Sequence, residues 1–193
     1  MIERNYGART KDVWDEYIWP SAYGVFFLRP AHFLTVKRAA KIEDGESVLE
    51  IGAGYPFYKV YSGDVGNQGH FVSVDSNPTI QKRSRNLLPN GKEHIVTADA
   101  NSLPFEDESF DVVIANNFNG PDGEWSFLKE TVRILKPQGR FISTFMEPAM
   151  IPIVSYLESR RLKTLGLQNV RLRPGIQLVV GGYWFVFAEK KQK

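Results

Sequence analysis

Apolar and polar positions follow two alternating patterns from residue 46 onward. Short, nearly continuous apolar runs predict five strands, at 47–51, 70–74, 94–98, 110–115 and 140–145. The segments between them are longer and of mixed polarity, and they predict helices at 56–63, 77–88, 123–135 and 150–165. Apolar strands separated by helices are typical of a parallel sheet covered on both faces, and the right-handed crossover rule makes such a domain doubly wound. The pattern therefore predicts an α/β domain whose ligand crevice lies beyond the carboxyl ends of the strands.

The C-terminal part departs from this alternation. The strand-like stretches "VRLR" (170–173) and "GGYWFVFAEK" (181–190) follow one another with only a turn between them. Such a connection favours an antiparallel hairpin. We therefore expect seven strands, mostly parallel, with an antiparallel edge strand.

The first 45 residues form a different kind of segment. They are rich in aromatic residues and are interrupted by Pro20 and Pro30, which indicates short helices. We expect an N-terminal helical cap over 1–45, packed over the crevice of a main domain at 46–193. The aromatic side chains of the cap have three interpretations: internal packing, a lid over an apolar or cationic substrate, or an interfacial surface that contacts lipid.

The amino-acid composition limits the number of domains, the types of metal site and the cellular compartment. The 193 residues suit one full domain with a small appendage, and the chain has no cysteine. That absence excludes disulfides and cysteine-ligated metal centres, and it fits a reducing compartment. The charged N-terminus does not resemble a secretory signal, and no apolar run is long enough to span a membrane. We predict a cytoplasmic protein with no metal site.

Charge is unevenly distributed although the net charge is only +2. Residues 46–128 hold 5 lysines and arginines against 12 acidic residues, whereas residues 129–193 hold 12 against 4. The simpler interpretation is a set of solvated faces. The alternative is a basic C-terminal surface that meets an anionic substrate or a membrane.

The first strand leads into a glycine loop. Gly52 and Gly54 lie where a strand turns directly into a helix, and a residue without a Cβ lets a ligand approach the backbone. Asp75 ends the next strand, 21 residues after Gly54, where a carboxylate can accept hydrogen bonds from both hydroxyls of a ribose. The structural alternatives are a plain turn for the glycines and a helix cap for Asp75.

The third glycine of a dinucleotide-binding loop is absent here. Phe57 occupies its place, and Pro56 removes a backbone N–H at the first helical position. Both changes disfavour a pyrophosphate, which binds free N–H groups at a helix N-terminus. The loop therefore favours a nucleoside that carries no phosphate, such as S-adenosylmethionine.

Four motifs in chain order carry a family resemblance. They are "VLEIGAGYP" (48–56), "FVSVDSNP" (71–78), "TADANSLPFEDESFDVVIANN" (97–117) and "LKETVRILKPQGRFISTF" (128–145). Over about residues 43–145 the chain resembles the class I S-adenosylmethionine-dependent methyltransferases, and within them the type 11 subgroup that includes the ubiquinone/menaquinone-type enzymes. The resemblance implies a Rossmann-like fold with a reversed last strand, S-adenosylmethionine as cofactor, and methyl transfer as activity.

The resemblance also implies residue roles. Glu50, Gly52 and Gly54 match the family's motif around the methionine and ribose portions of the cofactor, and Asp75 matches its ribose-binding acid. Asp99 and Ala100 match the pair that contacts the adenine. For Asp99 the structural alternative is that it caps the following turn. Asn116 matches the position near the sulfonium. Pro56 departs from the family pattern and puts the contacts to the methionine carboxylate in question.

The methyl acceptor and the catalytic groups are less defined by sequence. His32, in the predicted cap, is a candidate general base, and Asn117 and Asn119 are candidate substrate contacts, although a turn role is an equal alternative for the asparagines. The chain has little room for an insertion between 146 and 166 that would cover a substrate. We expect a small apolar or lipid-like acceptor and peripheral contact of the protein with a membrane. A protein or RNA acceptor, and a cofactor-binding regulator without activity, are the alternatives. No nucleic-acid-binding module is recognisable.

Overall fold

The computed structural model describes residues 29–52, 61–78, 93–116, 126–147, 159–175 and 182–192. Its strands are β1 (Ser47–Ile51), β2 (His70–Asp75), β3 (Glu93–Thr97), β4 (Phe110–Asn116), β5 (Leu135–Glu147), β6 (Leu167–Gly175) and β7 (Gly182–Lys190). The helices are α3 (Arg29–Ala40), the 3-10 helix η2 (Ser62–Val65) and α6 (Leu128–Ile134), with a further helical segment at 159–164.

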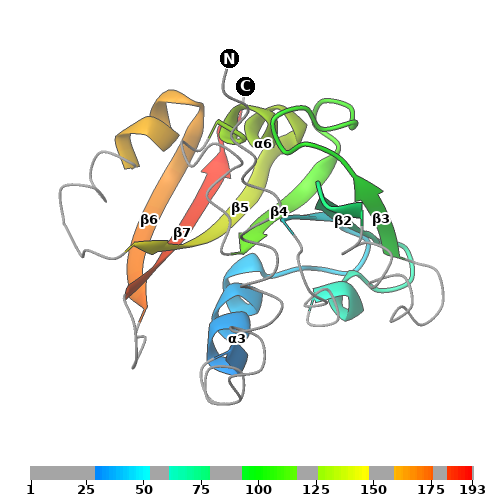
Figure 1. Cartoon of the computed structure of the whole chain (residues 1–193), viewed down its shortest axis with the longest axis horizontal. Coiled ribbons are helices and arrows are strands. Elements are labelled where there is room, and N and C mark those ends of the chain that lie inside the picture. The colour runs from blue at the N-terminus through cyan, green and yellow to red at the C-terminus, as the bar shows by residue number, and fades with distance from the viewer. Residues whose placement is uncertain are drawn as a thin grey trace. The chain divides into compact units, whose positions relative to one another are not determined.

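The seven strands form one sheet in the order β3-β2-β1-β4-β5-β7-β6 (Figure 1). Neighbouring strands from β3 to β5 are parallel, whereas β7 is antiparallel to both β5 and β6. The predicted doubly wound, mostly parallel sheet with a C-terminal antiparallel hairpin is therefore confirmed. The reversed strand is β7, which lies next to the edge, and β6 is the edge strand itself.

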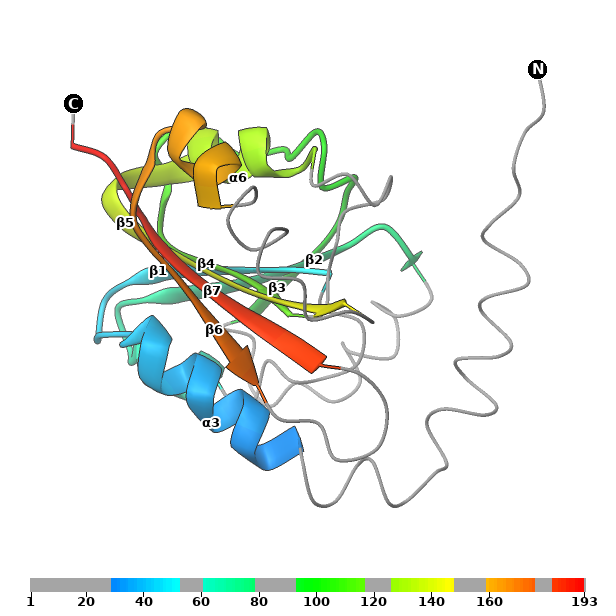
Figure 2. The same ribbon diagram turned by 90° about the vertical axis from the view of Figure 1, so that its left-hand side faces the viewer.

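The core lies between the sheet and the helices on one of its faces. Leu128 and Ile134 of α6 and Leu162 of the 159–164 segment join one buried cluster with side chains from β1, β2, β4, β5 and β7. Figure 2 shows α6 and the 159–164 segment on the same side of the sheet. Four of the five residues of β1 are buried, as expected for a central strand covered on both faces.

Two predicted boundaries near α6 are wrong. The predicted helix 123–135 ends at Ile134, because Leu135 is extended and pairs with Phe110 of β4. Pro137 disfavours the helical conformation for the residue before it, so the chain enters β5 early. Strand β5 also continues beyond the predicted residue 145, since its partner β7 pairs with it as far as Glu147.

The chain divides into two compact units, residues 1–36 and 37–193. Of the first unit the structure describes residues 29–36, the start of α3. The rest of the predicted cap lies outside the described residues, and so do most of the predicted helices at 56–63 and 77–88. The boundary at residue 45 stays a prediction. In the described part of the chain, no helix combines the length and the apolar character that a membrane span requires.

Gly69 provides a test of how β2 begins. A Cβ at this position would lie 2.3 Å from the Val65 carbonyl oxygen and 2.6 Å from that of Glu46. Both contacts are with backbone, so neither can relax by a rotamer change. We expect Gly69→Ala to lower the free energy of unfolding by about 1–3 kcal/mol, the usual cost of overpacking, as measured by urea denaturation. Gly63→Ala is the matched control, because its Cβ would have no neighbour within 4 Å; equal losses for the two variants would contradict this account.

Candidate cofactor site

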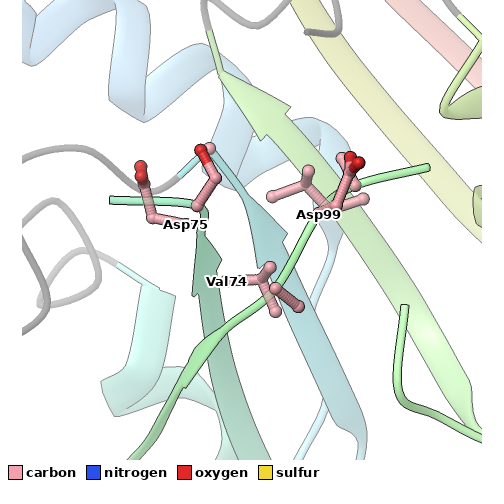
Figure 3. Close-up of a pocket in the computed structure, with 8 residues that line it drawn as sticks. Val74, Asp75 and Asp99 are labelled. Atoms are coloured by element: carbon pink, nitrogen blue, oxygen red, sulfur yellow. The ribbon is translucent and has the colours of Figure 1, made fainter. Parts of the chain in front are cut away.

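The carboxyl ends of β1, β2 and β3 form a pocket. Its lining comes from Ile51–Gly52, Val74–Ser76 and Ala98–Ala100. Parallel register brings these ends together, since Ile51 pairs with Val74 and Asp75 pairs with Thr97. In Figure 3, Asp75 and Asp99 lie on either side of Val74. Four of the residues that the sequence singled out, Gly52, Asp75, Asp99 and Ala100, are therefore brought together, although their contacts with a cofactor stay a prediction.

Gly52 makes the turn out of β1 sterically accessible. Its φ of +66° lies in the left-handed region, where a side chain is strained. Its N–H donates a 2.9 Å hydrogen bond to the Val74 carbonyl, which extends the β1–β2 pairing by one residue. The chain can then leave the sheet beside the pocket without a Cβ in the way.

Asp75 and Asp99 have the same local geometry. One carboxylate oxygen of Asp75 accepts the Asn77 N–H at 2.8 Å, and one of Asp99 accepts the Asn101 N–H at 2.9 Å. Each aspartate thus closes an Asx-turn, the kind of capping role that was the structural alternative for both residues. Capping and ligand binding are compatible, because a carboxylate has about four acceptor positions and each turn uses one of them. The turns fix the orientation of both side chains at the mouth of the pocket.

Other predicted site residues are distributed differently. Glu50 is only 1% exposed and lies in β1, but it does not line the pocket. Asn116 is the last residue of β4 and pairs with Thr144. Gly54, Asn117 and Asn119 lie outside the described residues. His32 belongs to α3, and its side chain is likewise outside the description.

Glu130 and Arg133, which we call the α6 clamp, form a site that was not predicted from the sequence. Arg133 Nε and Nη2 donate to the two carboxylate oxygens of Glu130 at 2.8 and 2.7 Å. The same guanidinium donates to the carbonyls of Leu103, at 3.0 Å, and Phe105, at 2.7 Å. Glu130 also accepts the Leu103 N–H at 2.9 Å. The clamp therefore joins α6 to the β3–β4 loop (98–109), which carries Asp99 and Ala100; the i,i+3 spacing of Glu130 and Arg133 was the available signal.

The clamp changes the acid–base properties of both members. The hydrogen bond from Arg133, supported by the backbone N–H of Leu103, holds the pKa of Glu130 below its ordinary value of 4.5, although burial opposes this. Hydrogen bonds to Glu130 and then to Asp107 raise the pKa of Arg133 above its ordinary range. Both residues are therefore charged at neutral pH.

The lowered pKa of Glu130 predicts how stability depends on pH. Because the folded-state pKa lies below the unfolded value of 4.5, the carboxylate contributes its full stabilisation above that value and loses it as the pH falls through the folded-state pKa. We expect the free energy of unfolding of the native chain to exceed that of Glu130→Gln near neutral pH, and the difference to shrink as the pH falls below about 4.5 towards the folded-state pKa. Urea denaturation across this range measures it. A difference independent of pH would contradict the assignment.

The chemistry of the pocket lining can be compared with that of a nucleoside. Its described lining combines apolar surface from Ile51, Val74 and Ala98 with two aspartates, and it includes no lysine or arginine. Apolar walls suit a flat base, and a carboxylate can accept hydrogen bonds from ribose hydroxyls. Two acids without a base disfavour a pyrophosphate and are compatible with a positively charged sulfonium. The residues present therefore fit S-adenosylmethionine. Among the described residues, no group of three or more histidines and acids could hold a metal ion.

Comparison with known proteins places this geometry in a family. The fold is that of a Rossmann-like domain, and residues 49–143 match the sequence model of the family described as "Methyltransferase domain". The chain contains a class I S-adenosylmethionine-dependent methyltransferase domain, and S-adenosylmethionine is the cofactor that this family implies.

Individual relatives agree with this assignment. The ubiquinone/menaquinone biosynthesis C-methyltransferase UbiE of Vibrio parahaemolyticus is 33% identical over 116 residues, which are 56% of this chain and 45% of the relative. The arsenite methyltransferase of Halobacterium salinarum is 34% identical over 122 residues, 60% of this chain and 31% of the relative. A solved S-adenosylmethionine-dependent methyltransferase from Aquifex aeolicus shares the fold, with a TM-score of 0.63 at 21% identity over 82% of this chain and 89% of that one. The chain spans less than half the length of the two curated relatives.

Asp75 allows a test of the predicted ribose contact. Asp75→Asn keeps an oxygen that can accept the Asn77 N–H, so the turn should persist, but it removes the charge. We expect the affinity for S-adenosylmethionine to fall by roughly ten- to a hundredfold, since hydrogen bonds to charged groups contribute about 1.5–3 kcal/mol. Isothermal titration calorimetry measures this loss, with Asp44→Asn as control, since it makes the same change at an exposed residue that does not line the pocket. Unchanged affinity in Asp75→Asn would make the ribose assignment wrong.

Proposed function

We propose that this protein transfers the methyl group of S-adenosylmethionine to a small, apolar or lipid-like acceptor. The observation that carries the proposal is the pocket at the carboxyl ends of β1–β3, where Gly52, Asp75 and Asp99 converge. The family match and the two curated relatives support a small-molecule acceptor. Because the chain covers less than half of each relative, the activity of those whole proteins does not by itself define the reaction here.

The protein's own contribution is orientation. When bound, S-adenosylmethionine supplies an activated methyl group on its sulfonium. The apolar walls of the pocket would hold the base, Asp75 the ribose, and the turn at Gly52 would leave space beside the backbone. Holding two reactants in register removes much of the entropic cost of a bimolecular displacement. A carbon nucleophile also needs a proton acceptor, and His32, Asn117 and Asn119 remain the candidates from sequence.

The relatives differ in acceptor chemistry. One is named for C-methylation in quinone biosynthesis and the other for arsenite, at nearly equal identity. We favour the quinone-like class, because the aromatic N-terminal segment and the short stretch between 146 and 166 suit an apolar acceptor that reaches the site from a membrane surface. On this basis we also propose a cytoplasmic location with peripheral membrane contact. Methylation of protein or RNA, and regulation by cofactor binding without turnover, are the alternatives.

Calorimetry with S-adenosylmethionine, S-adenosylhomocysteine and NAD tests the cofactor. We expect both adenosyl compounds to bind and NAD to bind far more weakly, because the described pocket lining offers two carboxylates to a pyrophosphate. Tight NAD binding, or no binding of either adenosyl compound, would refute the proposal.

The acceptor is then tested by turnover of methyl-labelled cofactor with quinols, lipids, arsenite, and protein and RNA extracts. Transfer to a quinol supports the proposed class, whereas transfer to protein or RNA supports that alternative. Cofactor binding without transfer to any of them supports the regulatory role. Flotation with neutral and anionic liposomes tests membrane contact, and failure to associate with either would exclude it under those conditions.

A further inference from the structure

We propose that the α6 clamp, Glu130 with Arg133, positions Asp99 and Ala100 for recognition of the adenine base. The inference rests on the proposed function, because it concerns the site that would hold S-adenosylmethionine. The two clamp residues do not line the pocket. They are positioning residues, and they act through the β3–β4 loop.

A continuous set of hydrogen bonds connects the pocket to the clamp. Asp99 accepts the Asn101 N–H through its side chain and the Ser102 N–H, at 3.0 Å, through its carbonyl. The next residue, Leu103, donates its N–H to Glu130 and accepts a hydrogen bond from Arg133. The peptide that follows the Asp99 turn is therefore held on both sides. A shift of the clamp would be passed to Asp99 within four residues of chain.

Further contacts hold the same loop against α6. The Ser126 hydroxyl donates to the Asn101 side-chain oxygen at 2.6 Å, just before α6 begins. At the other end of the helix, the Arg133 and Ile134 carbonyls accept the N–H groups of Glu108 and Ser109. Ala100 and Leu103 are buried in the core cluster that also contains Leu128 of α6. The loop is thus attached at its start, middle and end, and the clamp forms the middle attachment.

The chemistry of the clamp requires arginine. A guanidinium has five N–H donors in a rigid planar fork, and Arg133 uses it to reach two carbonyls and the carboxylates of Glu130 and Asp107 together. Its side chain is 30% exposed and that of Glu130 is 19% exposed, so the pair is only partly screened by water. A lysine could pair with Glu130 but could not hold both carbonyls in the same geometry.

The chain contains a matched control for this arrangement. Arg140, which pairs with Val112 of β4, also donates to two carbonyls, those of Ala40 and Lys41, and to the Glu46 carboxylate. Glu46 directly precedes β1, so this second clamp lies at the amino ends of the strands, away from the pocket. Arg140→Ala should cost stability as Arg133→Ala does, without a specific effect on ligand recognition.

The test compares two ligands that differ only at the base. S-adenosylhomocysteine carries the adenine amino group, and S-inosylhomocysteine carries an oxygen in its place. If Asp99 receives the amino group, the native protein binds S-adenosylhomocysteine more tightly. We expect Arg133→Ala to lower that affinity about tenfold, which is about 1.4 kcal/mol, and to reduce the discrimination between the two ligands several-fold. Arg140→Ala should leave the discrimination at its native value when both variants are measured well below their unfolding temperatures.

Each outcome decides a different point. If the native protein binds neither ligand, the proposed function fails and this inference fails with it. If it binds both equally, or if Arg133→Ala keeps native discrimination, the clamp does not position the adenine site, whereas the proposed binding of the cofactor still stands. Equal loss of discrimination in Arg133→Ala and Arg140→Ala would assign the effect to general destabilisation and overturn the proposal.

Two milder variants keep the test decisive if Arg133→Ala does not fold. Glu130→Gln preserves size and an acceptor oxygen but removes the charge, and we expect a smaller loss of discrimination in the same direction. Arg133→Lys retains the ion pair without the fork, so it should recover stability more fully than discrimination. Native discrimination in both folded variants would contradict the positioning role.

Discussion

Parallel pairing of β1 with β2, and of β2 with β3, is the constraint on which the site depends. Neighbouring parallel strands point the same way, so their carboxyl ends reach one edge of the sheet, and the register sets which residues meet there. Ile51 pairs with Val74, and Asp75 with Thr97. Since β1 is buried, a slip of one residue would turn its core side chains to the opposite face. The same strand register is therefore required to pack the core and to assemble the pocket.

The polar geometry of the pocket is built in layers. The aspartates at its mouth are oriented by Asx-turns within their own loops. The loop that carries Asp99 is in turn attached to α6 by Glu130 and Arg133. Helix α6 is fixed against the sheet through Leu128 and Ile134. Hydrophobic packing thus fixes α6 on the sheet, and hydrogen bonds from α6 to backbone groups of the loop fix the position of Asp99.

Much of the architecture was predictable because it depends on local patterns. Continuous apolar runs indicated the strands, and the glycine at position 52 indicated a turn that a side chain would strain, as its φ of +66° agrees. Element ends were less predictable. Leucine has a high helix propensity, but pairing with Phe110 places Leu135 in β5. The clamp was also missed, because two charged residues on a helix usually form a solvated face. Here Arg133 donates to backbone carbonyls 28 and 30 residues away, and Glu130 accepts a backbone N–H 27 residues away.

By itself, the sequence determined the class of sheet, the antiparallel C-terminal hairpin and the residues that meet at the ends of β1, β2 and β3. These follow from hydrophobic periodicity and from residue types with few conformational or chemical alternatives. Tertiary structure decided that β7 lies between β5 and β6, that Leu135 leaves the helix, and that Arg133 holds the loop behind Asp99. Each of these is a contact between segments distant in the chain. Its free energy depends on which surfaces meet in three dimensions, a property that local sequence does not encode.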